Sequence, residues 1–273
     1  MRKDVDKMNK TKVLTLMNEK GGVGKTTLAV HLAAALAIVG YKVMLIDTDP
    51  QASATLSYGI APDAKKNIFN LMVDEDEWRD VVIQPSKKLW AGGYEVKGSL
   101  AIVGGHLKTY AIPTLIRDTM LLKNRLEEIE GYVDIVVFDT SPQASLMNEA
   151  VVKATNYVII PTEPEPLSLS GTANTVYHLG ENNRNRAMNT PPVEILGIIP
   201  TMYRKTNSHD TGVGFLHDTY GDLVYNPVPL RIGISEASFS KQTVFAHAPE
   251  SDASKDMWAV MAQLMNQMAV VNG

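Results

Sequence analysis

The sequence contains no cysteine and no long apolar run, and it has no excess of positive charge. The missing cysteines exclude a disulfide framework, thiolate zinc sites and cysteine-ligated iron–sulfur clusters. No segment approaches the ~20 apolar residues that a membrane-spanning helix needs, and the charged first dozen residues lack the apolar core of a signal peptide. We therefore expect a cytoplasmic protein.

The charge balance limits the kinds of nucleic-acid binding that are open to this chain. Lys and Arg number 26 against 30 Asp and Glu, a formal net charge of -4. A protein that neutralises many phosphates needs clustered Lys and Arg. Any DNA contact must therefore come from a local basic patch, or from a surface that a second subunit completes.

Short apolar runs alternate with longer segments of helical spacing along the 273 residues. The runs are apolar throughout, as expected for strands buried on both faces. They lie at Val13–Met17, Lys42–Ile46, Ile135–Phe138, Tyr157–Ile160 and Ile195–Ile199, and the helical segments include Leu28–Val39 and Thr114–Ile129. This alternation predicts an α/β fold with a mostly parallel, twisted sheet and helices on both faces.

We predict one domain over residues 12–273, preceded by a short extension at residues 1–11. Two small domains would also fit the length alone. The least regular region, 62–110, has an acidic run and two glycine pairs, and it predicts short helices with one added strand at Leu100–Val103. Near the C-terminus, apolar residues at helical spacing predict a helix over Ser254–Val271.

A glycine-rich loop follows the first predicted strand and opens the first predicted helix. Its glycines allow the backbone N–H groups to curl around phosphate oxygens, and the helix N-terminus adds its positive dipole end. Lys25 would reach the β- and γ-phosphates, and the Thr26 hydroxyl would bind Mg²⁺. The residues expected to hold the nucleotide here are Lys20, Gly21, Gly22, Val23, Gly24, Lys25, Thr26 and Thr27.

The loop departs from the G-x-x-x-x-G-K-[ST] pattern because Glu19 replaces its first glycine and Lys20 adds a second lysine. Lys20 to Thr27 resembles the K-G-G-x-G-K-[ST]-[ST] loop of the ParA/MinD group, the deviant Walker A P-loop ATPases. The resemblance implies ATP and Mg²⁺ as ligands. It also implies that Lys20 contacts the nucleotide of the opposite subunit in an ATP-dependent homodimer.

Two aspartates follow predicted strands, where carboxylates organise Mg²⁺ and the attacking water. Asp47 begins Asp-Thr-Asp-Pro-Gln, which is similar to the family segment whose first aspartate orients the water. Asp49 is assigned to the same switch loop. Asp139 ends a Walker B pattern of four apolar residues and an aspartate. We expect Lys20, Lys25 and Asp47 to be catalytic, and Thr26, Asp47 and Asp139 to form the magnesium site.

No Asn-Lys-x-Asp segment follows the phosphate loop, so guanine recognition is not indicated and adenine is expected. The segments Pro200 to Tyr203 and Asn226 to Pro229 resemble those that hold adenine in the family, which makes Met202 and Pro229 candidate contacts. Ordinary turns at strand ends remain the alternative for both. The expected reaction is phosphoryl transfer from ATP to water.

The resemblance implies DNA segregation as the function. In the family, the ATP-bound dimer binds nonspecific double-stranded DNA on the nucleoid, and a centromere-binding ParB-like partner stimulates hydrolysis. The corresponding DNA-binding candidates are Arg204, Lys205, Arg231 and Lys241, although Leu230 and Gly233 stand where the family often has arginine. A solvated basic surface is the alternative for these residues.

Other functions of the family remain open. A MinD-like ATPase acting at a membrane needs a basic amphipathic C-terminal helix, yet no basic residue follows Lys255. Membrane binding is therefore not expected. A metal-maturation ATPase with thiolate ligands needs cysteines, and an ATPase that positions a protein assembly remains possible.

Overall fold

The computed structural model describes residues 10–63, 65–186 and 190–272. Most of the predicted extension at residues 1–11 lies outside these residues. The strands are β1 (Lys12–Leu16), β2 (Lys42–Asp47), β3 (Ser99–Val103), β4 (Ile135–Asp139), β5 (Tyr157–Thr162) and β6 (Glu194–Pro200). They form one sheet in the order β3-β2-β4-β1-β5-β6, and every neighbouring pair is parallel.

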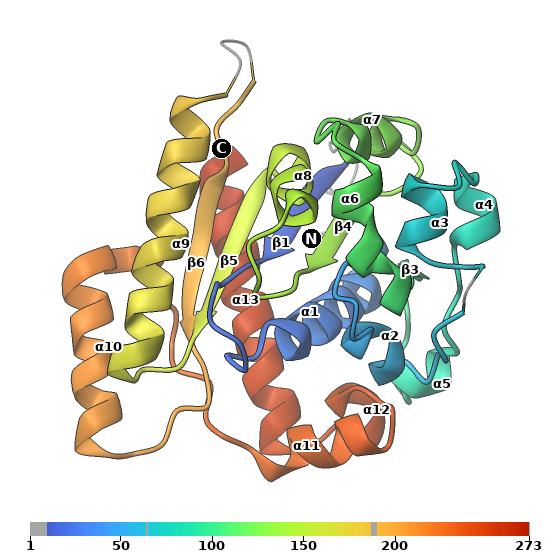
Figure 1. The fold of residues 1–273 in the computed structure, drawn as a ribbon. Coiled ribbons are helices and arrows are strands. Elements are labelled where there is room, and N and C mark those ends of the chain that lie inside the picture. Colours follow the sequence, from blue (N-terminus) through green and yellow to red (C-terminus); the bar gives the residue numbers. More distant parts are fainter. Residues whose placement is uncertain (1–9, 64, 187–189, 273) are drawn as a thin grey trace.

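Helices connect the parallel strands (Figure 1). The α-helices are α1 (Lys25–Val39), α2 (Ser53–Ser57), α3 (Ile68–Met72), α4 (Trp78–Val81), α5 (Lys87–Trp90), α6 (Ile112–Leu115), α7 (Leu121–Glu127), α8 (Leu146–Ala154), α9 (Pro166–Arg184), α10 (Asn207–Tyr220), α11 (Ile232–Phe239), α12 (Val244–His247) and α13 (Asp252–Asn272). Within the described residues there are also two 3₁₀ turns, η2 (Leu107–Ala111) and η3 (Gly221–Leu223).

Each face of the sheet carries its own apolar core, because successive residues of a strand point to opposite faces. Leu14 and Leu16 of β1 pack with α1 and α13 on one face. Val136 and Phe138 of β4 pack with α3, α7 and α8 on the other face. A third apolar cluster lies under α9 and α10, at the β5–β6 side of the sheet. The expected α/β fold with helices on both faces is confirmed.

All six expected strands are present within one or two residues of the predicted bounds. The continuous helix expected over Thr114–Ile129 is wrong. The chain is helical in α6 and α7 but extended between them, at Ile116. Asp118 caps the backbone N–H of Met120 (2.8 Å), and this local hydrogen bond competes with helix formation.

Residues 62–110 form the expected short helices α3, α4 and α5 and the added strand β3, on the same sheet. The predicted C-terminal helix is α13. Its apolar residues Met257, Met261, Leu264 and Met268 are buried in the α1 core, as expected for a packing helix. Among the described residues, no helix combines the length and apolar character needed to cross a bilayer.

Candidate nucleotide site

The phosphate loop leads from β1 into α1 at the carboxyl edge of the sheet. Gly22 and Gly24 have positive φ angles of 79° and 88°, a conformation that glycine adopts without steric cost. Gly24 is the N-cap of α1, and its carbonyl accepts the backbone N–H of Leu28 (3.0 Å). The loop therefore presents the free backbone N–H groups of a long helix N-terminus, as a phosphate site requires.

Lys25 is buried at the centre of this loop. Its ammonium donates to the backbone carbonyls of Asn18 (2.9 Å) and Lys20 (2.9 Å). Burial lowers the pKa of Lys25, while the charges of Asp139 and Asp49 oppose the shift. The positive charge expected to face the phosphates is thus held by the loop itself.

Thr26 and Asp139 lie together, as the magnesium prediction requires. The Thr26 hydroxyl donates to Asp139 Oδ2 (2.7 Å). Asp139 Oδ1 is buried and has no hydrogen-bond partner within the described chain. Burial, followed by the charge of Asp47, raises the pKa of Asp139 well above its usual range. A buried carboxyl oxygen without a hydrogen-bond partner fits a hard cation such as Mg²⁺, whose charge would favour the ionised form of Asp139.

Asp47 has a different environment, because its carboxylate is hydrogen-bonded to Thr55 of α2 and to Asp49. Its carboxylate is fully buried and accepts the Thr55 hydroxyl (2.7 Å), the Thr55 backbone N–H (2.9 Å) and the Asp49 backbone N–H (3.1 Å). Burial raises the pKa of Asp47 to about 6, although the Thr55 bonds oppose the shift. Both carboxylate oxygens are therefore engaged in fixing the turn between β2 and α2.

A large open cavity of about 960 Å³ covers the phosphate loop. Its lining includes Lys25, Thr26, Asp49, Tyr110 and residues of α11, but neither Asp47 nor Asp139. A smaller cavity of about 140 Å³ adjoins the loop at Gly24 and Thr27 and is lined by both adenine candidates, Met202 and Pro229. The structure thus brings the phosphate and adenine candidates together, and it places Asp49 rather than Asp47 at the cavity wall.

The DNA-binding candidates do not form one free basic patch. Arg204 lies 3.8 Å from Glu163 and 3.7 Å from Glu165. Arg231 is paired with Asp256 (2.7 Å) and with Asp252 (3.5 Å). Lys205 and Lys241 are exposed. Two of the four cations therefore already face carboxylates.

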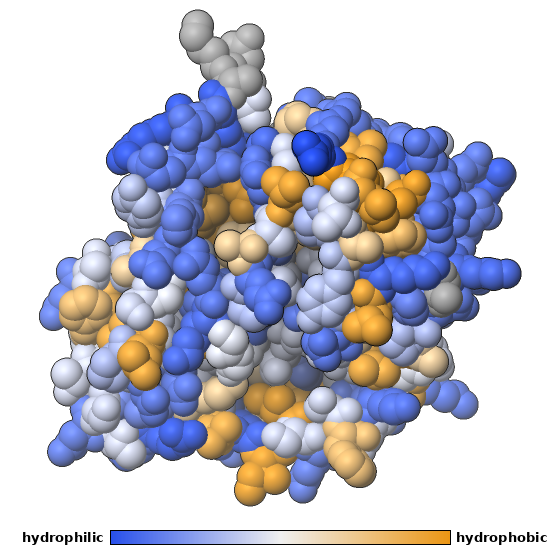
Figure 2. All heavy atoms as spheres, in the orientation of Figure 1, coloured by the Kyte–Doolittle hydropathy of each residue, from blue (hydrophilic) through white to orange (hydrophobic). Residues whose placement is uncertain are grey.

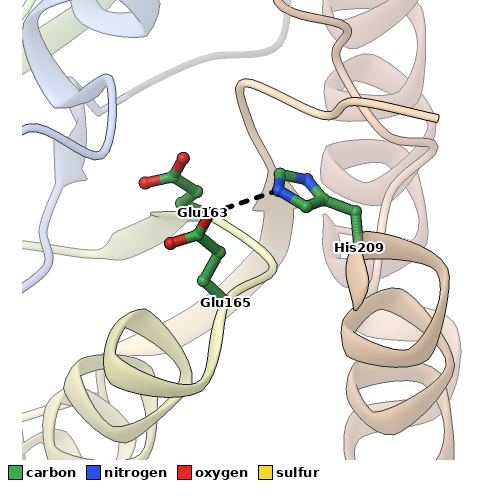
Figure 3. A group of neighbouring side chains, drawn as sticks. All are labelled: Glu163, Glu165 and His209. Carbon is green, nitrogen blue, oxygen red and sulfur yellow. Dashed lines mark ion pairs between the residues drawn. The ribbon is translucent and has the colours of Figure 1, made fainter. Parts of the chain in front are cut away.

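Glu163, Glu165 and His209 converge from the β5–α9 loop and α10 (Figure 3). His209 is buried, its Nδ1 accepts the Arg204 backbone N–H (3.2 Å), and its Nε2 lies 3.4 Å from Glu165. A neutral imidazole that accepts at Nδ1 carries its proton on Nε2, so the Nε2 atom that faces Glu165 is not free to bind a metal. The cluster links the β5–α9 loop to Arg204 and to the start of α10.

Some site residues could not be found from the sequence. Asn18 and Thr55 shape the phosphate and Asp47 loops through bonds to distant or later segments. His31 joins α1 to α12: its Nδ1 pairs with the Thr27 carbonyl (2.7 Å) and its Nε2 accepts the Val244 N–H (3.0 Å). Burial lowers the pKa of His31 to about 4, so the ring is neutral. No motif signalled these roles.

Comparison with known proteins identifies the family of the chain. The family described as "AAA domain" matches residues 11–189. The chain is 31% identical over 244 residues to the chromosome-partitioning ATPase Soj of Thermus thermophilus, covering 89% of this chain and 90% of that protein. It is 30% identical over 239 residues to the chromosome partitioning protein ParA of Caulobacter vibrioides, covering 85% and 86%.

The fold is also that of solved structures. An ATP complex of a McdA variant from Cyanothece superposes with a TM-score of 0.78 at 19% identity, over 93% of this chain and 96% of that one. The family match spans more than half of the chain, and two relatives of at least 30% identity extend over most of it. The chain therefore belongs to the ParA/MinD family of P-loop ATPases.

Proposed function

We propose that this chain is a dimerisation switch that binds ATP and Mg²⁺, hydrolyses ATP to ADP and phosphate, and drives the segregation of a plasmid or chromosome. In the ATP state the dimer would bind DNA nonspecifically, and a centromere-binding partner would stimulate hydrolysis. The observation that carries the ATPase part is the grouping of Lys25, Thr26 and the unpartnered Asp139 oxygen around one glycine loop.

The residues divide the work by position. Lys25 and the N-terminus of α1 would bind the phosphates, and Met202 and Pro229 would enclose the adenine. Thr26 and Asp139 would hold Mg²⁺, which supplies positive charge to the γ-phosphate when bound. Lys20 would act on the nucleotide of the second subunit, so that hydrolysis depends on the dimer.

We assign the orientation of the attacking water to Asp49 in preference to Asp47. Asp49 is part of the cavity wall, and a single backbone N–H, that of Gln51 (2.8 Å), bonds to its side chain. Asp47 already accepts three hydrogen bonds, which engage both of its carboxylate oxygens. A group that positions water needs a free oxygen facing the reaction. Asp47 would hold the loop that carries Asp49.

A second candidate function, the positioning of a protein assembly, is favoured by the surface at α11. Leu230, Ile232 and Phe239 are 52%, 78% and 92% exposed. Figure 2 shows apolar side chains at the lower edge of the molecule, over the start of α11. Exposed apolar side chains of this size suit a protein partner better than a phosphate backbone. A membrane-bound switch is not supported, because the apolar residues of α13 are buried in the core.

The first test is binding to nonspecific duplex DNA with no nucleotide, with ADP and with ATP-Mg²⁺, each at two salt concentrations. Wild type and Asp49→Ala would be compared, since the variant is expected to remain in the ATP state. Binding that needs ATP and weakens with salt is the expected result, because phosphate contacts release counterions. ATP-dependent dimers that bind no DNA would refute the DNA-segregation function and favour the protein assembly.

A further inference from the structure

The backbone that carries Lys20 is fixed by a residue that lies outside the glycine loop. Asn18 is 1% exposed. Its Oδ1 accepts the Lys20 backbone N–H (2.8 Å), and its Nδ2 donates to the Pro161 carbonyl of β5 (2.8 Å). Lys20 is thereby held to the central sheet through the side chain of Asn18.

The same stretch of backbone lies against small residues of α9. A Cβ at Gly171 would stand 3.0 Å from Asn18 Oδ1 and 3.1 Å from Lys20 Cβ, closer than side chains normally pack. One turn further on, Thr175 accepts the Glu19 backbone N–H at 3.3 Å. Because Gly171 has no side chain, Lys20 can pack directly against α9 at this position.

The carbonyl of Lys20 is fixed as well. It accepts a hydrogen bond from the Lys25 ammonium (2.9 Å). Three groups of Lys20 are thus restrained. Its N–H is bound by Asn18, its Cβ lies beside Gly171, and its carbonyl is bound by Lys25. A lysine loses much rotamer entropy when its ammonium is ordered. A fixed backbone direction reduces the range of positions that the side chain must search to reach a second subunit.

We propose that Asn18 and Gly171 are positioning residues for Lys20: they set the direction in which it leaves the loop toward the nucleotide of the partner subunit. Neither residue touches the nucleotide in this role. The inference rests on the proposed action of Lys20 across the dimer.

Gly171→Ala is the sharpest variant, because it removes no hydrogen bond and adds one methyl group. Gly180→Ala in the same helix is the matched control, since a Cβ there meets nothing within 4 Å. Replacement of glycine by alanine in a helix interior is normally stabilising. We expect both variants to fold and to bind ADP like wild type. In Gly171→Ala alone, ATP-dependent dimerisation should weaken and turnover should fall about tenfold or more, because the displaced Lys20 misses its target.

A mixing experiment separates positioning from a damaged site. Lys25→Ala lacks its own phosphate contact and the bond to the Lys20 carbonyl, but it keeps Asn18 and Gly171 beside Lys20. Mixed with it, Gly171→Ala should regain about a quarter of wild-type turnover, since half of the dimers are mixed and each mixed dimer has one complete site. Asn18→Ala should behave in the same way. A simple folding defect would not be rescued by such a partner.

Lys20→Ala mixed with Lys25→Ala tests the premise. If that mixture stays inactive, the action of Lys20 across the dimer is refuted and the inference falls with it. If it recovers while Gly171→Ala and Asn18→Ala mixtures do not, only the positioning role is wrong. Full turnover in Gly171→Ala on its own, or an equal loss in Gly180→Ala, would also overturn the proposal.

Discussion

Alanine substitution at the two aspartates of one loop, Asp47 and Asp49, should affect two different properties of the protein. Asp47→Ala removes the acceptor of three hydrogen bonds from a fully buried site. Asp49→Ala removes a half-buried carboxylate from the cavity wall, where Gln51 donates its one backbone N–H. The first change should lower stability, and the second should lower turnover.

The expected loss of stability follows from the contacts of Asp47. Each buried donor left without a partner costs about 1–3 kcal/mol. Removing the carboxylate also relieves its burial, since a pKa raised from 3.8 to about 6 corresponds to roughly 3 kcal/mol at neutral pH. A net loss on the order of 3 kcal/mol remains, which lowers Tm by roughly 5–10 °C in a domain of this size.

Asp49→Ala should leave Tm within a degree or two of wild type, because an exposed single hydrogen bond contributes little. Its turnover should fall about 100-fold or more if Asp49 orients the attacking water. ATP-dependent dimers should persist, since the phosphate loop is intact. Asp118→Ala is the matched control: Asp118 also accepts one backbone N–H two residues on, and it is exposed and outside the cavity.

Calorimetry, ATP turnover and size-exclusion chromatography in ATP would measure these effects together. The reasoning would be refuted if Asp49→Ala turned over ATP at the wild-type rate. It would equally fail if Asp47→Ala kept the wild-type Tm while trapping an ATP dimer. That second outcome would return the water-orienting role to Asp47, as the sequence predicts.

Three further predictions concern other parts of the site. The free energy of unfolding of wild type relative to His31→Gln should fall by up to ~3 kcal/mol as pH drops from 6.5 to 4, because the unfolded ring binds a proton that the folded ring, with a pKa of about 4, excludes. Thr26→Val should raise the Mg²⁺ concentration for half-maximal turnover about tenfold, since Asp139 would lose its hydroxyl partner. Glu165→Gln should strengthen DNA binding about two- to fivefold at low salt, because Arg204 would face one carboxylate fewer.

Each of these has a contradicting outcome. A pH-independent difference between wild type and His31→Gln, measured by urea unfolding, would mean that the buried ring does not titrate as described. An unchanged Mg²⁺ requirement in Thr26→Val would remove Thr26 from the metal site. Glu165→Gln should strengthen DNA binding more than Glu181→Gln, which changes a half-buried glutamate paired with Arg184. Equal effects of the two variants would mean that the first acts only through net charge.

The strands of the sheet and the position of the phosphate loop could be predicted from the sequence, because each depends on residues that are contiguous in the chain. A run of apolar residues that ends in Asp139 marks a strand and its site residue in one pattern. Thr114–Ile129 failed because a helical period says nothing of a capping bond such as that of Asp118, which interrupts the helix. A helical period predicts which side chains are buried in the core. It does not predict where the backbone stops being helical.

The division between Asp47 and Asp49 could not be derived from the loop alone. Both end the same strand motif, and what separates them is Thr55, eight residues later, which binds one carboxylate and not the other. The DNA-binding candidates show the same limit. Arg204 and Arg231 look like free cations in the sequence, but Glu165 and Asp256 meet them from other elements.

The same long-range contacts bear on the proposed action of Lys20 across a dimer. Lys25 lies toward its own phosphate cavity, yet its ammonium also holds the carbonyl of Lys20. Phosphates that enter the cavity compete with that carbonyl for the Lys25 ammonium, since a phosphate oxygen is the stronger acceptor. Binding of ATP would therefore release Lys20 from one restraint while Asn18 and Gly171 keep its direction. If ATP is to bind first and the partner subunit is to join second, Lys20 must lose one restraint on ATP binding and still keep its direction toward the partner.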